Sequence, residues 1–189
     1  MKKIILFASG SGSNAVNIIN YFNKRMTAVV ATVFCNNAQA KVIEKASDLG
    51  VPTVVFTKEE LEKGKILHDI DSIGPDLIVL AGFLLKFPPQ IVSAYQNKII
   101  NIHPALLPKY GGKGMYGMNV HRAVLENKDS HSGISIHLVN ENYDEGALIF
   151  QSEVLVGDCR EAEEIAAKVQ ELEQQFFPKV IEDFLNAAL

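Results

Sequence analysis

An amide and an imidazole stand two residues apart in the segment Ile99-Ile-Asn101-Ile-His103-Pro104. Because alternate residues of a strand point to the same face, Asn101 and His103 would lie side by side on a strand that Pro104 ends. The amide can donate a hydrogen bond to a developing oxyanion, and an imidazole with a pKa near neutrality can move a proton. The pair therefore suits acyl transfer, and a histidine that only holds the loop explains the same pattern equally well.

A carboxylate that could assist this histidine lies in the acidic turn Asn140-Glu-Asn-Tyr-Asp144-Glu-Gly146. A turn rich in Asn, Asp and Gly needs no functional explanation, so the spacing alone favours a plain turn. If Asp144 lay next to His103, its charge would raise the pKa of the imidazole and fix the orientation of the ring. Distance along the chain does not show that contact.

A glycine-rich turn, Ser9-Gly-Ser-Gly-Ser-Asn-Ala15, follows the first apolar run and precedes a helical pattern that Ser13 or Asn14 is expected to cap. Glycines allow the backbone to approach a ligand, and the helix N-terminus supplies free N–H groups. The dinucleotide fingerprint also requires a carboxylate after the second strand, whereas that strand ends Val33-Phe-Cys-Asn-Asn37. The turn therefore favours a phosphate monoester over a dinucleotide, and a tight turn that binds nothing is the alternative.

The elements that must position these groups alternate between apolar strands and amphipathic helices. We expect strands near 4–8, 27–34, 53–56, 76–81 and 98–102. Helices are expected near 13–22 and 38–49, over 57–73 with Thr57 as the cap, and from Pro88 onward. This order predicts an α/β fold, a mostly parallel twisted sheet with helices on both faces. A long loop over 103–118, a helix over 119–127, strands over 133–139 and 147–156 and a helix over 161–185 then follow. A loop of that length inside a compact domain is typical of a functional segment.

The composition is that of a soluble globular protein, with 189 residues of which 48% are hydrophobic and 21% charged. We expect one domain, 1–189, in the cytoplasm. The net charge of −4 argues against nucleic acid as a partner, and no apolar run reaches the roughly 20 residues of a membrane span. The two cysteines provide neither a disulfide framework nor a zinc site, and the histidine spacing indicates no metal. The oligomeric state is not readable.

Five segments, in this order and at this spacing, resemble a known family over nearly the whole chain. They are Gly10-Ser-Gly-Ser-Asn14, Leu80-Ala-Gly-Phe83, Asn101-Ile-His-Pro-Ala-Leu-Leu-Pro108, Gly133-Ile-Ser-Ile-His137 and Asp144-Glu-Gly146. The family is that of the phosphoribosylglycinamide formyltransferases, folate-dependent enzymes of purine synthesis with a Rossmann-like formyltransferase fold.

The resemblance implies formyl transfer from 10-formyltetrahydrofolate to the amine of glycinamide ribonucleotide, without a metal or a covalent enzyme intermediate. Asn101 would stabilise the oxyanion, His103 would act as acid and base, and Asp144 would raise the pKa of the histidine and order a water. The ribonucleotide would contact Gly12, Ser13, Asn14, Gln170 and Glu173. The folate would contact Leu84, Leu85, Lys86, Phe87, Asn101 and Val139.

Three features depart from the family pattern. Ala105 replaces the usual serine, and Leu85 stands where many relatives have an arginine, with Lys86 one position away and Lys58 a weak substitute. The loop 110–118 is longer than in many relatives and, with four glycines, is a mobile lid or a simple insertion.

Other functions compatible with the same residues are methionyl-tRNA formyltransferase, formyltetrahydrofolate hydrolase or another folate-dependent formyltransferase, and a binding protein without catalysis. The first usually adds a C-terminal RNA-binding domain and the second an N-terminal regulatory domain, and we expect neither here. The third predicts an incomplete Asn, His and Asp set, whereas all three residue types are present.

Overall fold

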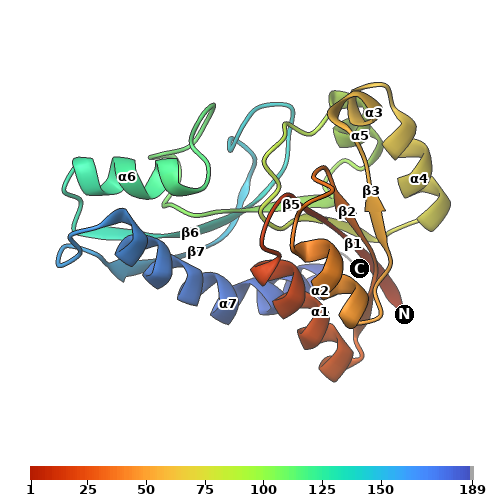
Figure 1. Cartoon of the computed structure of the whole chain (residues 1–189), viewed down its shortest axis with the longest axis horizontal. Coiled ribbons are helices and arrows are strands. Elements are labelled where there is room, and N and C mark those ends of the chain that lie inside the picture. Colours follow the sequence, from red (N-terminus) through yellow and green to blue (C-terminus); the bar gives the residue numbers. More distant parts are fainter. Residues whose placement is uncertain (188–189) are drawn as a thin grey trace.

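The computed structural model describes residues 1–187, which form a sheet of seven strands in the order β3-β2-β1-β4-β5-β6-β7 (Figure 1). The strands are β1 (Lys2–Ala8), β2 (Ala28–Cys35), β3 (Thr53–Val55), β4 (Leu77–Leu80), β5 (Ile99–His103), β6 (His131–Leu138) and β7 (Leu148–Leu155). Neighbours from β3 to β5 pair in parallel, and β6 and β7 continue the sheet in antiparallel fashion. The expected α/β fold with a mostly parallel sheet is confirmed.

Helices cover both faces of this sheet (Figure 1). They are α1 (Ser13–Arg25), α2 (Val42–Asp48), α3 (Lys58–Glu62), α4 (Lys65–Ile73), α5 (Pro89–Ala94), α6 (Met118–Glu126) and α7 (Ala162–Ala187). Residues of α1, α2 and α7 share one hydrophobic cluster, and residues of α3, α4 and α5 share a second one. Strand β1 is apolar from Ile4 to Ala8 because both of its faces are covered: Ile4 and Leu6 enter the first cluster, while Ile5 and Phe7 enter the second.

The helix boundaries differ from the expected ones where backbone geometry overrides the sequence pattern. The helix expected over 57–73 is divided into α3 and α4 by Gly64, whose φ is +82°; the expected cap at Thr57 is confirmed, with a complete capping box to Glu60. Helix α2 begins only at Val42. Helix α1 is capped by Gly12 and not by the side chain of Ser13 or Asn14, because the left-handed backbone of Gly12 ends the preceding turn.

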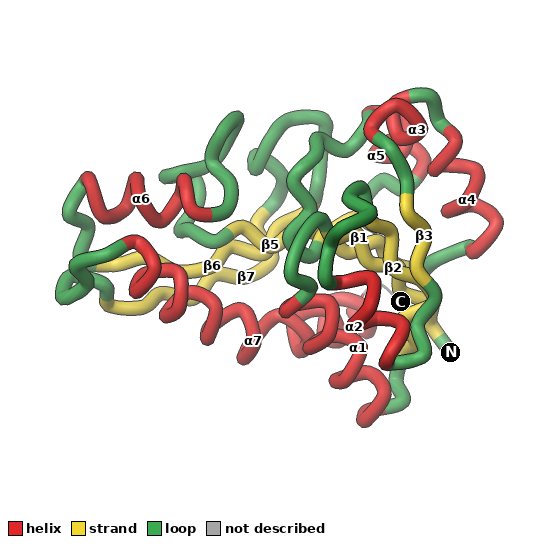
Figure 2. The backbone as a smooth tube through the Cα atoms, in the orientation of Figure 1, coloured by secondary structure: helices red, strands yellow, loops and turns green. Residues whose placement is uncertain are grey.

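The carboxyl ends of β1, β4 and β5 meet near the middle of the sheet, since these strands are parallel neighbours. Figure 2 shows loops gathering on one side of the sheet above its centre. Among them is the long loop expected after β5, which contains no strand or helix until α6 begins at Met118. Ligands of open α/β sheets bind at such an edge. None of the helices in residues 1–187 is long and apolar enough to span a membrane.

Candidate active site

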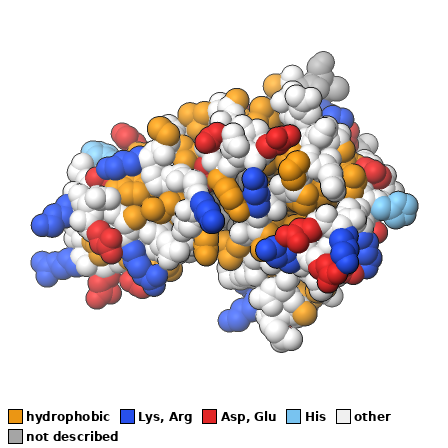
Figure 3. Space-filling model, turned by 90° about the horizontal axis from the view of Figure 1, so that it is seen from above, with side chains coloured by type: hydrophobic (Ala, Val, Ile, Leu, Met, Phe, Trp, Pro, Cys, Tyr) orange, Lys and Arg blue, Asp and Glu red, His pale blue; other side chains and the backbone are white. Residues whose placement is uncertain are grey.

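A cavity of about 590 Å³ opens at this edge, and most of the residues singled out from the sequence line it. Its wall includes residues of the glycine turn (Gly10–Asn14), the strand-end segment that follows β4 (Leu84–Phe87), and the ends of β5 and β6. Seen from above, hydrophobic side chains and charges of both signs meet near the middle of this face (Figure 3). The cavity therefore offers both apolar and polar contacts to a ligand.

Strand pairing places four polar side chains at the floor of the cavity. Asn101 lies opposite His137 in the β5–β6 ladder, and His103 lies opposite Ser135. All four residues therefore share one face of the sheet, as the spacing of Asn101 and His103 predicts. Asn101, His103 and His137 line the cavity, and Ser135 is fully buried beneath it.

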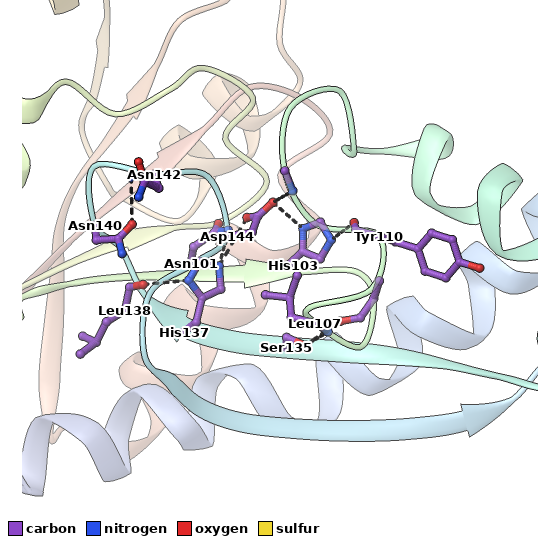
Figure 4. A network of polar contacts seen from close by, with 12 residues as sticks. Asn101, His103, Leu107, Tyr110, Ser135, His137, Leu138, Asn140, Asn142 and Asp144 are labelled. Atoms are coloured by element: carbon purple, nitrogen blue, oxygen red, sulfur yellow. Dashed lines mark hydrogen bonds and ion pairs between the residues drawn. The ribbon is translucent and has the colours of Figure 1, made fainter.

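His103 is held in one tautomer by the loop that follows it. Its Nε2 lies 2.7 Å from the carbonyl oxygen of Tyr110, and a carbonyl only accepts, so this nitrogen carries the proton. Nδ1 then faces Oδ2 of Asp144 at 3.6 Å (Figure 4). Burial lowers the pKa of His103 more than the charge of Asp144 raises it, so the pKa lies below its ordinary value. Asp144 thus acts on this pKa in the expected direction, and burial outweighs it.

Asp144 meets His103 although 41 positions separate them in the printed sequence. Its side chain is 10% exposed and its φ is +54°, an uncommon backbone conformation for a residue other than glycine. Oδ2 accepts the backbone N–H of Gly112 at 3.0 Å. Burial acts to raise the pKa of Asp144, but His137, His103 and the Gly112 N–H together hold it below its ordinary value. The carboxyl group is therefore charged at neutral pH.

The orientation of the Asn101 amide follows from the hydrogen bonds of His137. The Nδ1–H of His137 donates to the carbonyl oxygen of Leu138 at 2.8 Å, so a ring with a single proton has Nε2 as an acceptor. That Nε2 lies 3.2 Å from Nδ2 of Asn101, which donates to it in the singly protonated ring, and 3.5 Å from Oδ1 of Asp144, to which it donates only when the ring carries both protons (Figure 4). His137 thereby fixes which end of the amide is the donor. The NH₂ group retains a second proton, which can serve as a donor to a ligand.

Ser135 organises the loop after β5 from below, a role that sequence reasoning did not assign to it. Its Oγ donates to the carbonyl of Ala105 at 2.6 Å and accepts the N–H of Leu107 at 2.9 Å. Gln151 of β7 adds a third hydrogen bond, at 2.8 Å to the same Oγ. A serine at position 105 is not required for this contact, because the backbone of the loop makes it. The one signal that could have pointed to this role of Ser135 is its pairing opposite His103 in the β5–β6 ladder.

The glycine turn is tightly packed at Gly12. Its φ is +73°, and a Cβ there would lie 2.6 Å from Cγ2 of Val42, so only glycine fits. Beside it, the Asn14 side chain donates to Oε2 of Glu173 at 2.9 Å. Burial raises the pKa of Glu173, partly offset by the Asn14 hydrogen bond. Gly12, Ser13, Asn14 and Glu173 all line the cavity, whereas Gln170 is exposed and lines a separate shallow depression on α7.

The strand-end segment brings Leu84, Leu85, Lys86 and Phe87 to the cavity, together with Val139 beyond the end of β6. Phe87 is buried and Leu84 is half exposed. The Lys86 ammonium lies over the ring of Tyr143 at 5.5 Å from its centroid. The positive charge of this segment thus comes from Lys86, next to the position of Leu85. Lys58, the weaker candidate, begins α3 and forms an ion pair with Glu62 at 3.5 Å.

A second buried imidazole, His121, also lines the cavity. It is 6% exposed, and its Nδ1 has no hydrogen-bond partner within residues 1–187. Burial, with a smaller effect from His103, lowers its pKa to about 4. Its spacing from the other histidines gave no metal pattern, and the described residues contain no group of three His, Cys, Asp or Glu side chains arranged to hold a metal ion. Lys113 and Tyr116, in the loop 110–118 that precedes α6, also line the cavity.

Comparison with known proteins gives a consistent result. The family model described as formyl transferase matches residues 2–181. The phosphoribosylglycinamide formyltransferase of Escherichia coli (strain K12) is 36% identical over 98% of this chain and 88% of that protein. The chloroplastic phosphoribosylglycinamide formyltransferase of Arabidopsis thaliana is 37% identical over 95% of this chain, which spans 64% of that protein.

Solved structures of two other proteins share the fold of this chain over nearly its whole length. Glycinamide ribonucleotide transformylase 1 from Geobacillus kaustophilus superposes with a TM-score of 0.88 at 33% identity, covering 98% of this chain and 99% of that one. Phosphoribosylglycinamide formyltransferase from Anaplasma phagocytophilum gives a TM-score of 0.90 at 29% identity, covering 98% and 88% of the two chains.

Proposed function

Since this chain belongs to the phosphoribosylglycinamide formyltransferase family, we propose that it transfers a formyl group from 10-formyltetrahydrofolate to the amine of glycinamide ribonucleotide in de novo purine biosynthesis. One observation carries the proposal. Asn101, His103 and Asp144 meet in a cavity that the glycine turn and the strand-end segment both line. Two ligands that bind these two segments would each reach the three polar groups.

The reaction forms a bond between the acceptor nitrogen and the formyl carbon and breaks the bond between that carbon and the donor nitrogen. The acceptor amine loses one proton, and the donor nitrogen gains one. The second proton of the Asn101 NH₂ group would stabilise the charge that develops on the formyl oxygen. His103 would carry the proton on Nδ1, because its Nε2–H is held by Tyr110. Asp144 would stabilise the imidazolium at 3.6 Å and order a water.

The acceptor would bind at the glycine turn. The N-terminus of α1 begins at Ser13, directly after Gly12, and helix N-termini favour a phosphate through free N–H groups and the helix dipole. Glu173 and Asn14 lie beside it in the same wall and would accept hydrogen bonds from, or donate them to, the ribose hydroxyls. Gln170 is part of this predicted set, although it lies outside the cavity.

The donor would bind at the strand-end segment. Leu84, Leu85 and Phe87, with Val139, give this part of the wall an apolar surface suited to a flat heteroaromatic ring. Lys86 supplies one positive charge there, suited to a negatively charged tail. Asn101 would contact the formyl group between the two segments.

The experiment that tests the proposal follows the loss of 10-formyltetrahydrofolate by absorbance, with and without glycinamide ribonucleotide. We expect turnover that requires the ribonucleotide. Turnover at the same rate with water alone would assign the protein as a formyltetrahydrofolate hydrolase. Absence of turnover, with both ligands shown to bind, would contradict the catalytic role.

A further inference from the structure

Ser9, which follows β1 directly and precedes Gly10, makes three hydrogen bonds at the edge of the sheet and is 8% exposed. Its backbone N–H donates to the carbonyl of Gly82 at 3.1 Å. Its Oγ lies 2.6 Å from Oδ1 of Asn36 and 3.0 Å from the backbone nitrogen of Leu84. A backbone N–H only donates, so the hydroxyl accepts from Leu84 and gives its single proton to Asn36. The Ser9 hydroxyl therefore donates one hydrogen bond, to Asn36, and accepts one, from Leu84.

These bonds join the two segments that line the cavity. Gly10, the next residue, begins the glycine turn, and Leu84 begins the strand-end segment. Asn36 directly follows β2, so the ends of three neighbouring strands are tied together through one hydroxyl. Ser9 itself is not among the described residues that line the cavity. Ser9 would therefore affect a bound ligand only by positioning Leu84 and Gly10, which do line the cavity.

We propose that Ser9 is a positioning residue that sets the distance between the two substrate-binding segments, and that it does so by holding the Leu84 N–H. The substrates named for each segment rest on the proposed function. In a transfer between two bound molecules, the separation of the reacting atoms follows from the separation of their binding segments. A misplacement of about 1 Å at the reacting atoms can lower the rate about 10²-fold.

Removal of the hydroxyl would affect the two segments unequally. In Ser9→Ala the Leu84 N–H loses its acceptor, whereas the backbone hydrogen bond from Ser9 to Gly82 and that from Val42 to the Gly10 carbonyl remain. The glycine turn therefore keeps its position, and the strand-end segment loosens. We expect the KM for the donor to rise about tenfold and kcat to fall about tenfold, with the KM for the ribonucleotide changed by less than about twofold.

The test compares steady-state constants for Ser9→Ala, Asn36→Ala and Asn36→Asp in the full chain. Asn36→Asp retains an oxygen that accepts the Ser9 proton, so its donor KM should stay near that of the wild type. Asn36→Ala should raise the donor KM less than Ser9→Ala does, because the hydroxyl can still accept from Leu84. The double variant Ser9→Ala/Asn36→Ala should match Ser9→Ala alone, since the two residues act as one unit. Asn36→Ala also serves as the test if Ser9→Ala does not fold.

Ser132→Ala is the matched control, because Ser132 is a buried serine on β6 whose Oγ has no hydrogen-bond partner in the described part of the chain. It should leave both KM values unchanged. A Ser9→Ala variant with an unchanged donor KM, or with a larger rise in the ribonucleotide KM, would overturn the proposal.

Hydrogen–deuterium exchange of the peptide that contains Leu84 separates this inference from the proposed function. Exchange at this amide should be faster in Ser9→Ala than in the wild type, whether or not the wild type transfers formyl groups. Equal exchange rates would overturn the link between Ser9 and Leu84. Wild-type protein without transfer activity would instead overturn the proposed function.

Discussion

The Nδ1 atom of His103 lies 3.6 Å from Oδ2 of Asp144, while the Nε2–H on the other side of the ring donates to the carbonyl of Tyr110. The nitrogen that is free to take up a proton is therefore the one that faces the carboxylate. Gly112 donates its N–H to the same carboxylate oxygen at 3.0 Å. The loop after β5 thus holds both residues, His103 through the Tyr110 carbonyl and Asp144 through the Gly112 N–H.

Removal of the Asp144 charge should slow turnover with little effect on substrate binding. Asp144→Asn retains the shape of the side chain but not the charge that stabilises the imidazolium, so we expect kcat to fall about 10²- to 10⁴-fold. Steady-state kinetics with both substrates measures this. Glu145→Gln is the control, because Glu145 is exposed and next in sequence. A kcat for Asp144→Asn within twofold of that for the control would remove Asp144 from the mechanism.

The pH profile should show the low pKa of His103. Burial lowers this pKa below its ordinary value of 6.5, so the neutral ring that accepts a proton persists to lower pH than in a free histidine. We expect kcat/KM to reach a plateau at higher pH and to fall in acid, with a midpoint under 6.5. In Asp144→Asn the midpoint should move lower still, since the aspartate charge raises this pKa. A wild-type midpoint above 6.5 would contradict the structure.

Gly12→Ala should weaken the ribonucleotide site and the fold together. The new Cβ would lie 2.7 Å from Cβ and 2.9 Å from Cα of Val42, and φ is +73°, so trimming the Val42 side chain cannot relieve the clash. We expect at least a tenfold rise in the KM for the ribonucleotide and a loss of about 1–3 kcal/mol in the free energy of unfolding. Urea unfolding and kinetics measure both.

Gly10→Ala is the matched control for that experiment, because a Cβ at Gly10 meets nothing within 4 Å. Its ribonucleotide KM should stay close to that of the wild type. Equal effects of the two alanines would show that the turn responds to the loss of any glycine and not to the contact with Val42.

His121 should make the fold sensitive to mild acid. The pKa of His121 is about 4 in the folded chain, mainly because of burial, against an ordinary value of 6.5. The unfolded chain therefore takes up a proton first as the pH falls, and the stability present above pH 6.5 declines down to about pH 4. The loss approaches about 3 kcal/mol. His121→Leu should flatten the melting temperature across this range, and a wild-type slope that persists in the variant would assign the effect to other groups.

Sequence reasoning was most successful where the apolar pattern is unambiguous. The strands β1, β4 and β5 are buried on both faces, so their continuous apolar runs predicted them, and Thr57 predicted the start of α3. It was less successful where a single backbone angle decides the outcome. The break at Gly64 and the cap at Gly12 depend on positive φ values, which a glycine in a sequence permits but does not require.

The site was predictable in its residue types and not in its contacts. Asn101 and His103 share a face because of their spacing alone, whereas Asp144 reaches His103 only through the β5–β6 pairing and the turn that follows. The net direction of the His103 pKa depends on burial, which the sequence does not show. Ser135 and Ser9 act through backbone groups of distant loops, and a lone serine carries no signal of such contacts.

The most direct test of the account is a transfer experiment with 10-formyltetrahydrofolate that carries ¹³C in the formyl group. Wild-type protein is mixed with the labelled donor and glycinamide ribonucleotide, and ¹³C NMR identifies the molecule that holds the label. We expect a formamide signal on the ribonucleotide, formed roughly 10²- to 10⁴-fold more slowly by His103→Ala. Label released as free formate, or a ribonucleotide that stays unlabelled, would contradict it.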